Sequence, residues 1–175
     1  MKPRFISDIH LSEDNPHLTD AFKAFLSESK ESCTHLFILG DLFEIWIGDD
    51  AHTPYYQEIK KILKNFTSDG PKTFFIHGNR DFLIGENFAN EVGISILPDP
   101  YTLNINGLNV ILSHGDFLCT DDVEYINFRN KVRSEEWQKD FLSKDVGERN
   151  EIANSLRSGS KDATSKKSLD ITDAN

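Results

Sequence analysis

The chain has 175 residues, of which 38% are hydrophobic and 13 are phenylalanine, a composition that excludes an intrinsically disordered chain. Its formal net charge of −10 excludes a bulk affinity for nucleic acid, whose phosphates require a basic surface. No segment is apolar for long enough to predict a membrane span or a signal peptide, so we expect a cytosolic protein.

The first elements alternate between strand and helix. Residues 4–7 (RFIS) predict a strand that stops at Asp8. Residues 15–30 predict a helix with Asn15 as its N-cap and Pro16 at its first helical position. Apolar residues recur there with the spacing of one buried helix face, namely Leu18, Ala21, Phe22, Phe25 and Leu26.

The alternation continues along the chain. Residues 34–40 (THLFILG) predict a second buried strand, and residues 53–66 predict a helix capped by Thr53. A third strand is predicted over residues 72–78 (KTFFIHG). Residues 101–115 predict a hairpin, because an Asn-Gly pair can adopt the two positive φ angles of a type I′ turn. Strand–helix–strand alternation predicts an α/β fold with parallel strands.

The character of the chain changes near residue 120. Residues 120–175 are polar and helical in pattern, with weak apolar stripes and no strand signal. We predict an α/β core over residues 1–119 and a helical insertion over the active-site edge of the sheet, formed by residues 120–160. Residues 161–175 are predicted to begin the return to the core.

Polar residues follow each predicted strand. They are Asp8 and His10 after the first, Asp41 after the second, Asn79, Arg80 and Asp81 after the third, and His114 and Asp116 after the hairpin. Parallel strands bring their carboxyl ends to one edge of a sheet, where α/β proteins bind ligands. Carboxylate, imidazole and amide groups suit Mn²⁺, Fe²⁺ or Zn²⁺.

The same residues predict a two-metal centre, which requires a bridging carboxylate and separate ligands for each metal. Asp41 is the expected bridge because it follows the central strand. Asp8 and His10 would hold one metal, and Asn79 and His114 the other. Glu44 is interpreted as an acid in the first turn of a helix, and Asp49 and Asp50 as loop or capping groups.

The motifs SDIHL, LGDLFEIWIGDD, FIHGNRDFLIG and SHGDFLCTDD resemble the calcineurin-like metallophosphoesterase superfamily, and most closely its UDP-2,3-diacylglucosamine pyrophosphohydrolases of lipid A biosynthesis. The resemblance implies an αββα sandwich, incomplete at its C-terminus, with the helical insertion as a lid for acyl chains. It implies two Mn²⁺ ions and hydrolysis of the lipid substrate by a metal-activated water. A monomer in peripheral contact with the cytoplasmic face of the inner membrane is expected.

The resemblance also implies roles for single residues. Asn79 and Arg80 would act in catalysis and contact the phosphates. Four further residues match positions that hold the glucosamine phosphate and sugar, namely Asp122, Ser160, Thr164 and Lys167. Arg80 stands where many superfamily members place His. Because Arg stays protonated, it suits a leaving group that departs without a proton, such as the phosphate of a pyrophosphate.

Two departures from the family pattern keep alternatives open. The last histidine is His114, so the chain contains no GHxH motif, which by resemblance supplies a ligand to each metal. The predicted insertion is mostly polar, with Trp137, Phe141 and Leu142 as its main apolar residues. One alternative is a related enzyme that acts on soluble nucleotide pyrophosphates. The other is a non-catalytic, metal-binding fragment.

Overall fold

The computed structural model describes the backbone of residues 1–165 and the side chains of residues 1–158. The chain divides into two compact units, Met1–His114 and Gly115–Asn175, and each is described by itself.

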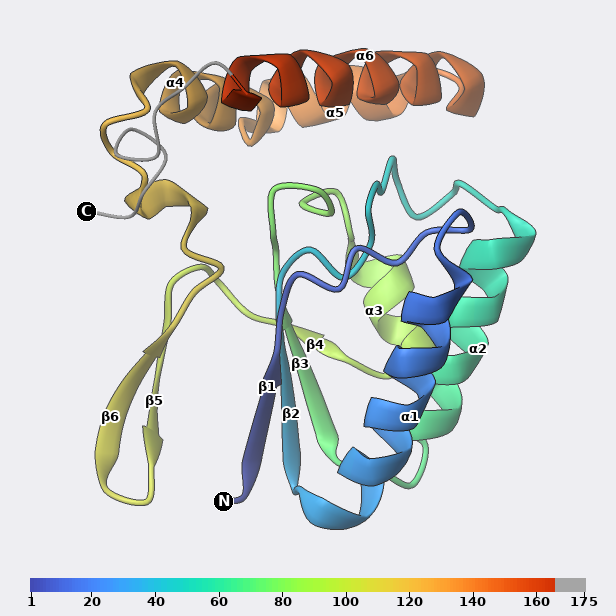
Figure 1. Cartoon of the computed structure of the whole chain (residues 1–175), viewed down its shortest axis with the longest axis vertical. Coiled ribbons are helices and arrows are strands. Elements are labelled where there is room, and N and C mark those ends of the chain that lie inside the picture. The colour runs from blue at the N-terminus through green and yellow to red at the C-terminus, as the bar shows by residue number, and fades with distance from the viewer. Residues whose placement is uncertain (166–175) are drawn as a thin grey trace. The chain divides into compact units, whose positions relative to one another are not determined.

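The first unit is built on a parallel four-stranded sheet in the order β1-β2-β3-β4 (Figure 1). Its strands are β1 (Pro3–Ile6), β2 (His35–Leu39), β3 (Lys72–Ile76) and the short β4 (Ser95–Ile96). The register pairs Phe5 with Phe37 and Phe37 with Phe74, and these rings stack across three strands. The first three strands confirm the sequence-based prediction.

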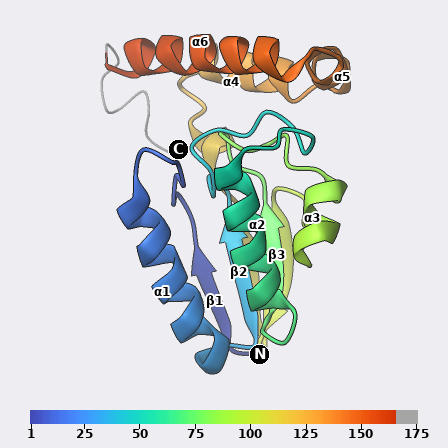
Figure 2. The same cartoon turned by 90° about the vertical axis from the view of Figure 1, so that its right-hand side faces the viewer.

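Three helices cover one face of this sheet, namely α1 (Pro16–Ser32), α2 (Pro54–Thr67) and α3 (Glu86–Val92) (Figure 2). Both long helices begin at a proline, and Thr53 caps α2 by accepting the Tyr56 N–H at 3.1 Å. Phe22 and Leu26 of α1 are buried as predicted. Ala21 is exposed, contrary to the prediction, because its position falls at the rim of the apolar stripe.

The other face carries an antiparallel hairpin of β5 (Tyr101–Ile105) and β6 (Leu108–Leu112) (Figure 1). Asn106 and Gly107 have φ angles of 53° and 93°, which confirms the predicted turn. Leu112 of the hairpin joins Phe37 and Ile76 of the sheet in one buried cluster. The predicted α/β class is confirmed, with helices, parallel sheet and hairpin as successive layers.

The second unit is helical over the residues that the structure describes. It contains a short 3₁₀ turn, η1 (Asp116–Leu118), and the helices α4 (Val123–Val132), α5 (Glu135–Ser143) and α6 (Val146–Ser165). Asp116 Oδ2 accepts hydrogen bonds from Tyr125 Oη and Arg129 Nε, both at 2.8 Å, which ties η1 to α4. Within the part of the chain described, no helix is both long and apolar enough to cross a bilayer.

Candidate metal centre

The carboxyl ends of β1 and β2 lead into two loops that run side by side. Asp8 and His10 follow β1, Asp41 follows β2, and all three adopt left-handed backbone angles, with φ of 54°, 52° and 52°. Such angles are uncommon for residues other than glycine, although Asp and His tolerate them better than most. They bring one ligand atom from each residue within 4.8 Å of the others, so this group can hold a metal ion.

Asp41 lies at the centre of the candidate site. Its side chain is 4% exposed, and its two carboxylate oxygens face different histidines. Oδ2 lies 3.7 Å from His10 Nε2, and Oδ1 lies 3.7 Å from His114 Nε2. Burial raises the pKa of Asp41, while the charges of His114 and His10 and a hydrogen bond from the Arg80 N–H act in the opposite direction. A cation beside Asp41 would favour its ionised form.

His114 is oriented by the backbone. Its Nδ1 lies 2.9 Å from the Leu39 carbonyl oxygen, which can only accept a hydrogen bond. In the neutral imidazole, Nε2 therefore carries a lone pair, and it lies 3.1 Å from Asn79 Oδ1. Two lone pairs that face one another at this distance suit a shared cation. Asn79 Oδ1 and His114 Nε2 thus lie close together, with His114 Nε2 on the Oδ1 side of Asp41, and their role as a ligand pair stays a prediction.

Asp81 holds the two central loops against each other. Its buried carboxylate accepts the backbone N–H groups of Gly78, Asp41, Leu42 and Phe43 at 2.9, 3.2, 2.7 and 3.4 Å. Burial and the neighbouring charge of Asp41 raise the pKa of Asp81 to about 7. The sequence places Asp81 at the sheet edge but gives it no role, and the structure shows that it fixes the backbone of the metal-ligand loops.

Two glycines permit this close approach. A Cβ atom on Gly78 would lie 2.1 Å from Asp41 Oδ1. A Cβ atom on Gly40, which has a φ of 88°, would lie 2.6 Å from His114 Nδ1. Larger residues would therefore displace the predicted ligands.

Arg80 lies in the same loop as Asn79. Its backbone N–H donates to Asp41 Oδ1 at 2.9 Å, and its carbonyl accepts from the Trp46 N–H at 3.1 Å. Its side chain is half-buried, and Nε is a buried donor with no hydrogen-bond partner among the residues that the structure describes. A buried guanidinium N–H without an acceptor is costly, and a phosphate oxygen is a suitable acceptor.

The acids of the GDLFEIWIGDD segment have roles that the sequence only partly predicts. Residues 41–50 form no helix, so Glu44 is not in a first helical turn. Glu44 Oε2 instead lies 2.9 Å from His10 Nδ1. Asp49 is a capping group as predicted, since it accepts the N–H groups of Gly85 and Phe88 at the start of α3. Asp50 lies exposed in a turn.

The four residues predicted to hold the glucosamine phosphate and sugar come after residue 114, in the sequence of the second unit. Asp122 is the N-cap of α4 and accepts the Tyr125 N–H at 3.0 Å. Ser160 and Thr164 belong to α6, but their side chains lie outside the described part of the structure. Lys167 lies outside the described residues altogether. The substrate roles of all four, and the placement of the helical unit over the sheet edge, stay predictions.

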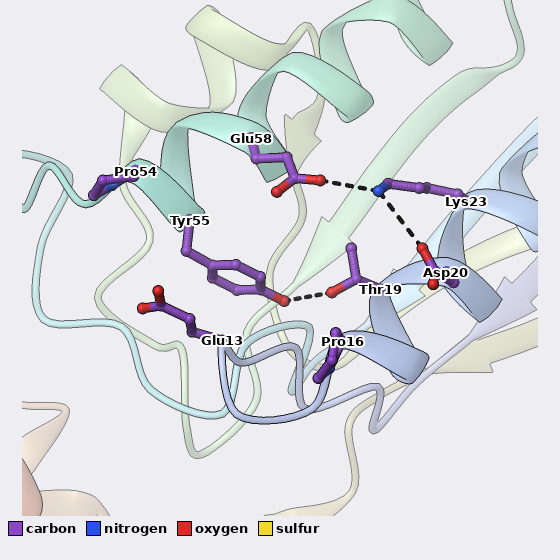
Figure 3. A pocket seen from close by; sticks show the side chains of 8 residues that line it. All are labelled: Glu13, Pro16, Thr19, Asp20, Lys23, Pro54, Tyr55 and Glu58. Carbon is purple, nitrogen blue, oxygen red and sulfur yellow. Dashed lines mark hydrogen bonds and ion pairs between the residues drawn. The ribbon is translucent and has the colours of Figure 1, made fainter.

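A pocket of about 310 Å³ lies elsewhere, between α1 and α2 (Figure 3). Its polar groups satisfy one another: Thr19 Oγ1 lies 2.7 Å from Tyr55 Oη, and Lys23 Nζ lies 2.9 Å from Glu58 Oε1. None of the predicted site residues lines this pocket. Because these side chains pair with one another, we interpret the pocket as a surface feature of the packing of α1 and α2.

Comparisons with known proteins bear on the whole chain. The family model described as calcineurin-like phosphoesterase matches residues 1–167. The chain is 46% identical over 175 residues to UDP-2,3-diacylglucosamine hydrolases from Enterobacter sp. (strain 638) and Salmonella typhi. It is 47% identical to the corresponding protein of Salmonella arizonae. These alignments cover 100% of the chain and 73% of each relative.

Solved structures with a similar backbone are more distant. A Pseudomonas putida nuclease is 23% identical, with a TM-score of 0.45 over 58% of this chain and 50% of the nuclease. A protein of unknown function from Aquifex aeolicus is 18% identical, with a TM-score of 0.48 over 75% of this chain and 71% of that one.

Proposed function

Because the chain belongs to the calcineurin-like phosphoesterase family and aligns along its full length with UDP-2,3-diacylglucosamine hydrolases, we propose that it hydrolyses the pyrophosphate bond of UDP-2,3-diacylglucosamine. The products are UMP and 2,3-diacylglucosamine 1-phosphate, an intermediate of lipid A biosynthesis. The bond that forms joins a water oxygen to phosphorus, and the bond that breaks is the anhydride P–O bond.

The arrangement of Asp41 carries this proposal. Its two oxygens each face a histidine, 3.7 Å away, from a different loop. This is the geometry expected of a carboxylate that bridges two metals. Asp8 and His10 complete one ligand set, and Asn79 and His114 belong to the other. Their carboxylate, imidazole and amide donors fit divalent cations such as Mn²⁺, which we propose as a pair in each active site.

Bound cations of this kind would neutralise phosphate charge and make water a stronger nucleophile at neutral pH. The residues of the chain position the ligands and contact the phosphate. Asp81 and the glycines keep the ligand loops in place, and Arg80 extends a guanidinium group whose buried Nε has no acceptor among residues 1–158. We propose that Arg80 donates to a phosphate oxygen and stabilises charge there. Since Arg80 cannot act as an acid at neutral pH, the product leaves as a phosphate that needs no proton.

The helical unit is the proposed binding region for the acyl chains. Phe128, Leu142 and Leu156 are exposed apolar side chains on its three helices, which suits contact with lipid. We propose that the protein works as a monomer at the cytoplasmic face of the inner membrane, where its lipid substrate resides. Most other positions of α5 and the described part of α6 are polar, which favours a second candidate: hydrolysis of soluble nucleotide pyrophosphates.

Measurement of UMP release distinguishes hydrolysis of the lipid substrate from hydrolysis of soluble nucleotide pyrophosphates. The experiment compares UDP-2,3-diacylglucosamine with UDP-glucose, with Mn²⁺ added after removal of bound metal by a chelator. Two polypeptides are assayed: the 175-residue chain and an extended chain, in which it is joined to the residues of the Salmonella typhi hydrolase outside the aligned region. The proposal expects Mn²⁺-dependent release from the diacylated substrate by the extended chain. Preferential release from UDP-glucose supports the soluble-substrate alternative, and no release from either contradicts both.

A further inference from the structure

The Glu44 carboxylate lies against a predicted metal ligand without belonging to the group that can hold the metal. His10 directs Nε2 toward the metal-binding group, 3.7 Å from Asp41 Oδ2 and 4.0 Å from Asp8 Oδ1. Its other nitrogen, Nδ1, lies 2.9 Å from Glu44 Oε2. The two ring nitrogens therefore face different partners, and the Glu44 contact falls on the side opposite the proposed metal.

The backbone fixes this contact. The loops after β1 and β2 are joined by hydrogen bonds from the Leu11 N–H to the Leu42 carbonyl at 2.9 Å and from the Glu44 N–H to the Leu11 carbonyl at 3.1 Å. Leu11 and Phe43 also form an isolated parallel bridge, and both side chains are fully buried. The position of the Glu44 backbone relative to the residue after His10 is therefore set by the core.

The contact acts through charge. Although the two atoms lie only 2.9 Å apart, Nδ1 makes no hydrogen bond to the carboxylate. The Glu44 side chain is 17% exposed, which limits the screening of its charge by water. A carboxylate at this distance favours a proton on Nδ1. The neutral imidazole then keeps its lone pair on Nε2, which faces Asp41 and Asp8.

We propose that Glu44 is a positioning residue for the metal centre. It holds the proton of His10 on Nδ1 and fixes the ring, so that Nε2 is ready to bind a cation. This inference rests on the proposed metal site, but it requires neither the proposed substrate nor any turnover. Carboxylates that orient metal-binding histidines in this way typically change metal affinity by 10–100-fold when they are removed.

The first experiment determines which ring nitrogen of His10 carries the proton. The ¹⁵N signals of the His10 ring are recorded in the chelator-treated, metal-free 175-residue protein at about pH 8, well above the ordinary imidazole pKa. The wild-type protein should show the Nδ1–H tautomer. Glu44→Ala should shift His10 toward the Nε2–H tautomer, whereas Glu44→Gln should shift it less, because the amide oxygen keeps a partial negative charge near Nδ1. Glu13→Ala removes a carboxylate from the exposed loop after His10 and should leave the tautomer unchanged.

Mn²⁺ binding, followed by the loss of the free-ion electron paramagnetic resonance signal, gives the second reading. The dissociation constant of Glu44→Ala should rise by about 10–100-fold, with a smaller rise for Glu44→Gln. Circular dichroism verifies that both variants fold, and if Glu44→Ala does not, the comparison of Glu44→Gln with wild type decides. An unchanged His10 tautomer overturns the proposal. Weakened binding without a tautomer change overturns it too, because Glu44 would then act as a ligand or as a structural group.

Discussion

At the scale of single residues, the candidate site combines backbone strain with buried charge. Asp8, His10 and Asp41 all adopt left-handed φ angles, which cost on the order of 1–3 kcal/mol each for residues other than glycine. The Asp81 carboxylate and the hydrogen bonds between the loops hold this strain in place. Strained residues that lie together at one sheet edge are typical of functional sites, and here their ligand atoms converge.

Asp41→Ala should remove most of the bound Mn²⁺ while leaving the fold intact. Asp41 is the residue whose two oxygens face both histidines, so its loss weakens both proposed ligand sets. Metal stoichiometry of the extended chain, measured by elemental analysis after dialysis, checks the prediction. Asp20→Ala, on the exposed face of α1, is the control. A variant that still binds as much metal as wild type would show that Asp41 is not the bridge.

Arg80→Ala in the extended chain should lower kcat by about 10²–10³, the usual cost of losing one donor that stabilises charge in a transition state. The reason is that its buried Nε has no acceptor within the described part of the chain, so we expect it to be available to the substrate. Arg80→Lys keeps the charge without the planar fork and should recover only part of the rate. An effect confined to KM would mean that Arg80 binds substrate and transition state equally.

At the scale of elements, Asp49 joins the segment after β2 to α3. Its Oδ1 accepts from the Gly85 N–H at 3.0 Å and from Trp46 Nε1 at 3.2 Å, and its Oδ2 accepts from the Phe88 N–H at 2.9 Å. The loop that carries Arg80 leads into α3, and the Arg80 carbonyl accepts a hydrogen bond from the Trp46 N–H at 3.1 Å. Capping of α3 therefore also limits the freedom of this loop.

Asp49→Ala should lower the free energy of unfolding by about 1–3 kcal/mol, because it leaves helix N–H groups without an acceptor. Asp49→Asn retains one carbonyl oxygen and should cost less. Urea denaturation of the metal-free proteins measures both changes. Equal stability of Asp49→Ala and wild type would mean that water replaces the carboxylate at no cost.

The central strand β2 supplies a pH-dependent contribution to stability. His35 on this strand stacks on the rings of Phe37 and Phe74. Burial lowers the pKa of His35, and the positive charges of Lys72 and the N-terminus lower it further. The unfolded chain therefore binds a proton more readily than the folded chain, and stability falls as the pH falls below about 6.5.

His35→Gln should reduce this loss of stability. The difference in unfolding free energy between about pH 8 and about pH 5.5 should be smaller in the variant than in wild type, with a chelator present throughout. His17→Gln, which removes an imidazole from an exposed position on α1, serves as the control. If His35→Gln and wild type lose the same stability, the folded and unfolded states protonate His35 alike.

The strongest sequence signals at this scale are those with a local cause. Pro16 restricts its own φ angle, Thr53 caps α2 with its side chain, and the Asn106–Gly107 pair tolerates positive φ angles. Each of these causes is local, so the helix starts and the hairpin turn could be predicted. The short α3 was not predicted, because part of its start is capped by Asp49, far away in sequence. The contact of Glu44 with His10 was not predicted for the same reason, since only the pairing of two loops brings the two residues together.

At the scale of the whole molecule, the number of predicted ligands can be compared with the number that two metals require. The motifs provide five predicted ligands, namely Asp8, His10, Asp41, Asn79 and His114, and the described structure brings them to one sheet edge. By resemblance, each metal would receive a further imidazole from a GHxH motif, and no such motif occurs within the 175 residues. The helical unit described here provides no histidine.

The 175-residue polypeptide should therefore bind Mn²⁺ weakly and hydrolyse UDP-2,3-diacylglucosamine slowly or not at all. Loss of a group that merely orients a ligand costs about 10–100-fold in affinity, and loss of an imidazole ligand from each metal should cost at least as much. The extended chain should restore both properties, since it supplies the rest of a relative in which the aligned region is 73% of the length. Parallel Mn²⁺ titrations and assays of UMP release compare the two polypeptides. Equal affinity and turnover would contradict the prediction, and other residues of the 175 would then have to complete the site.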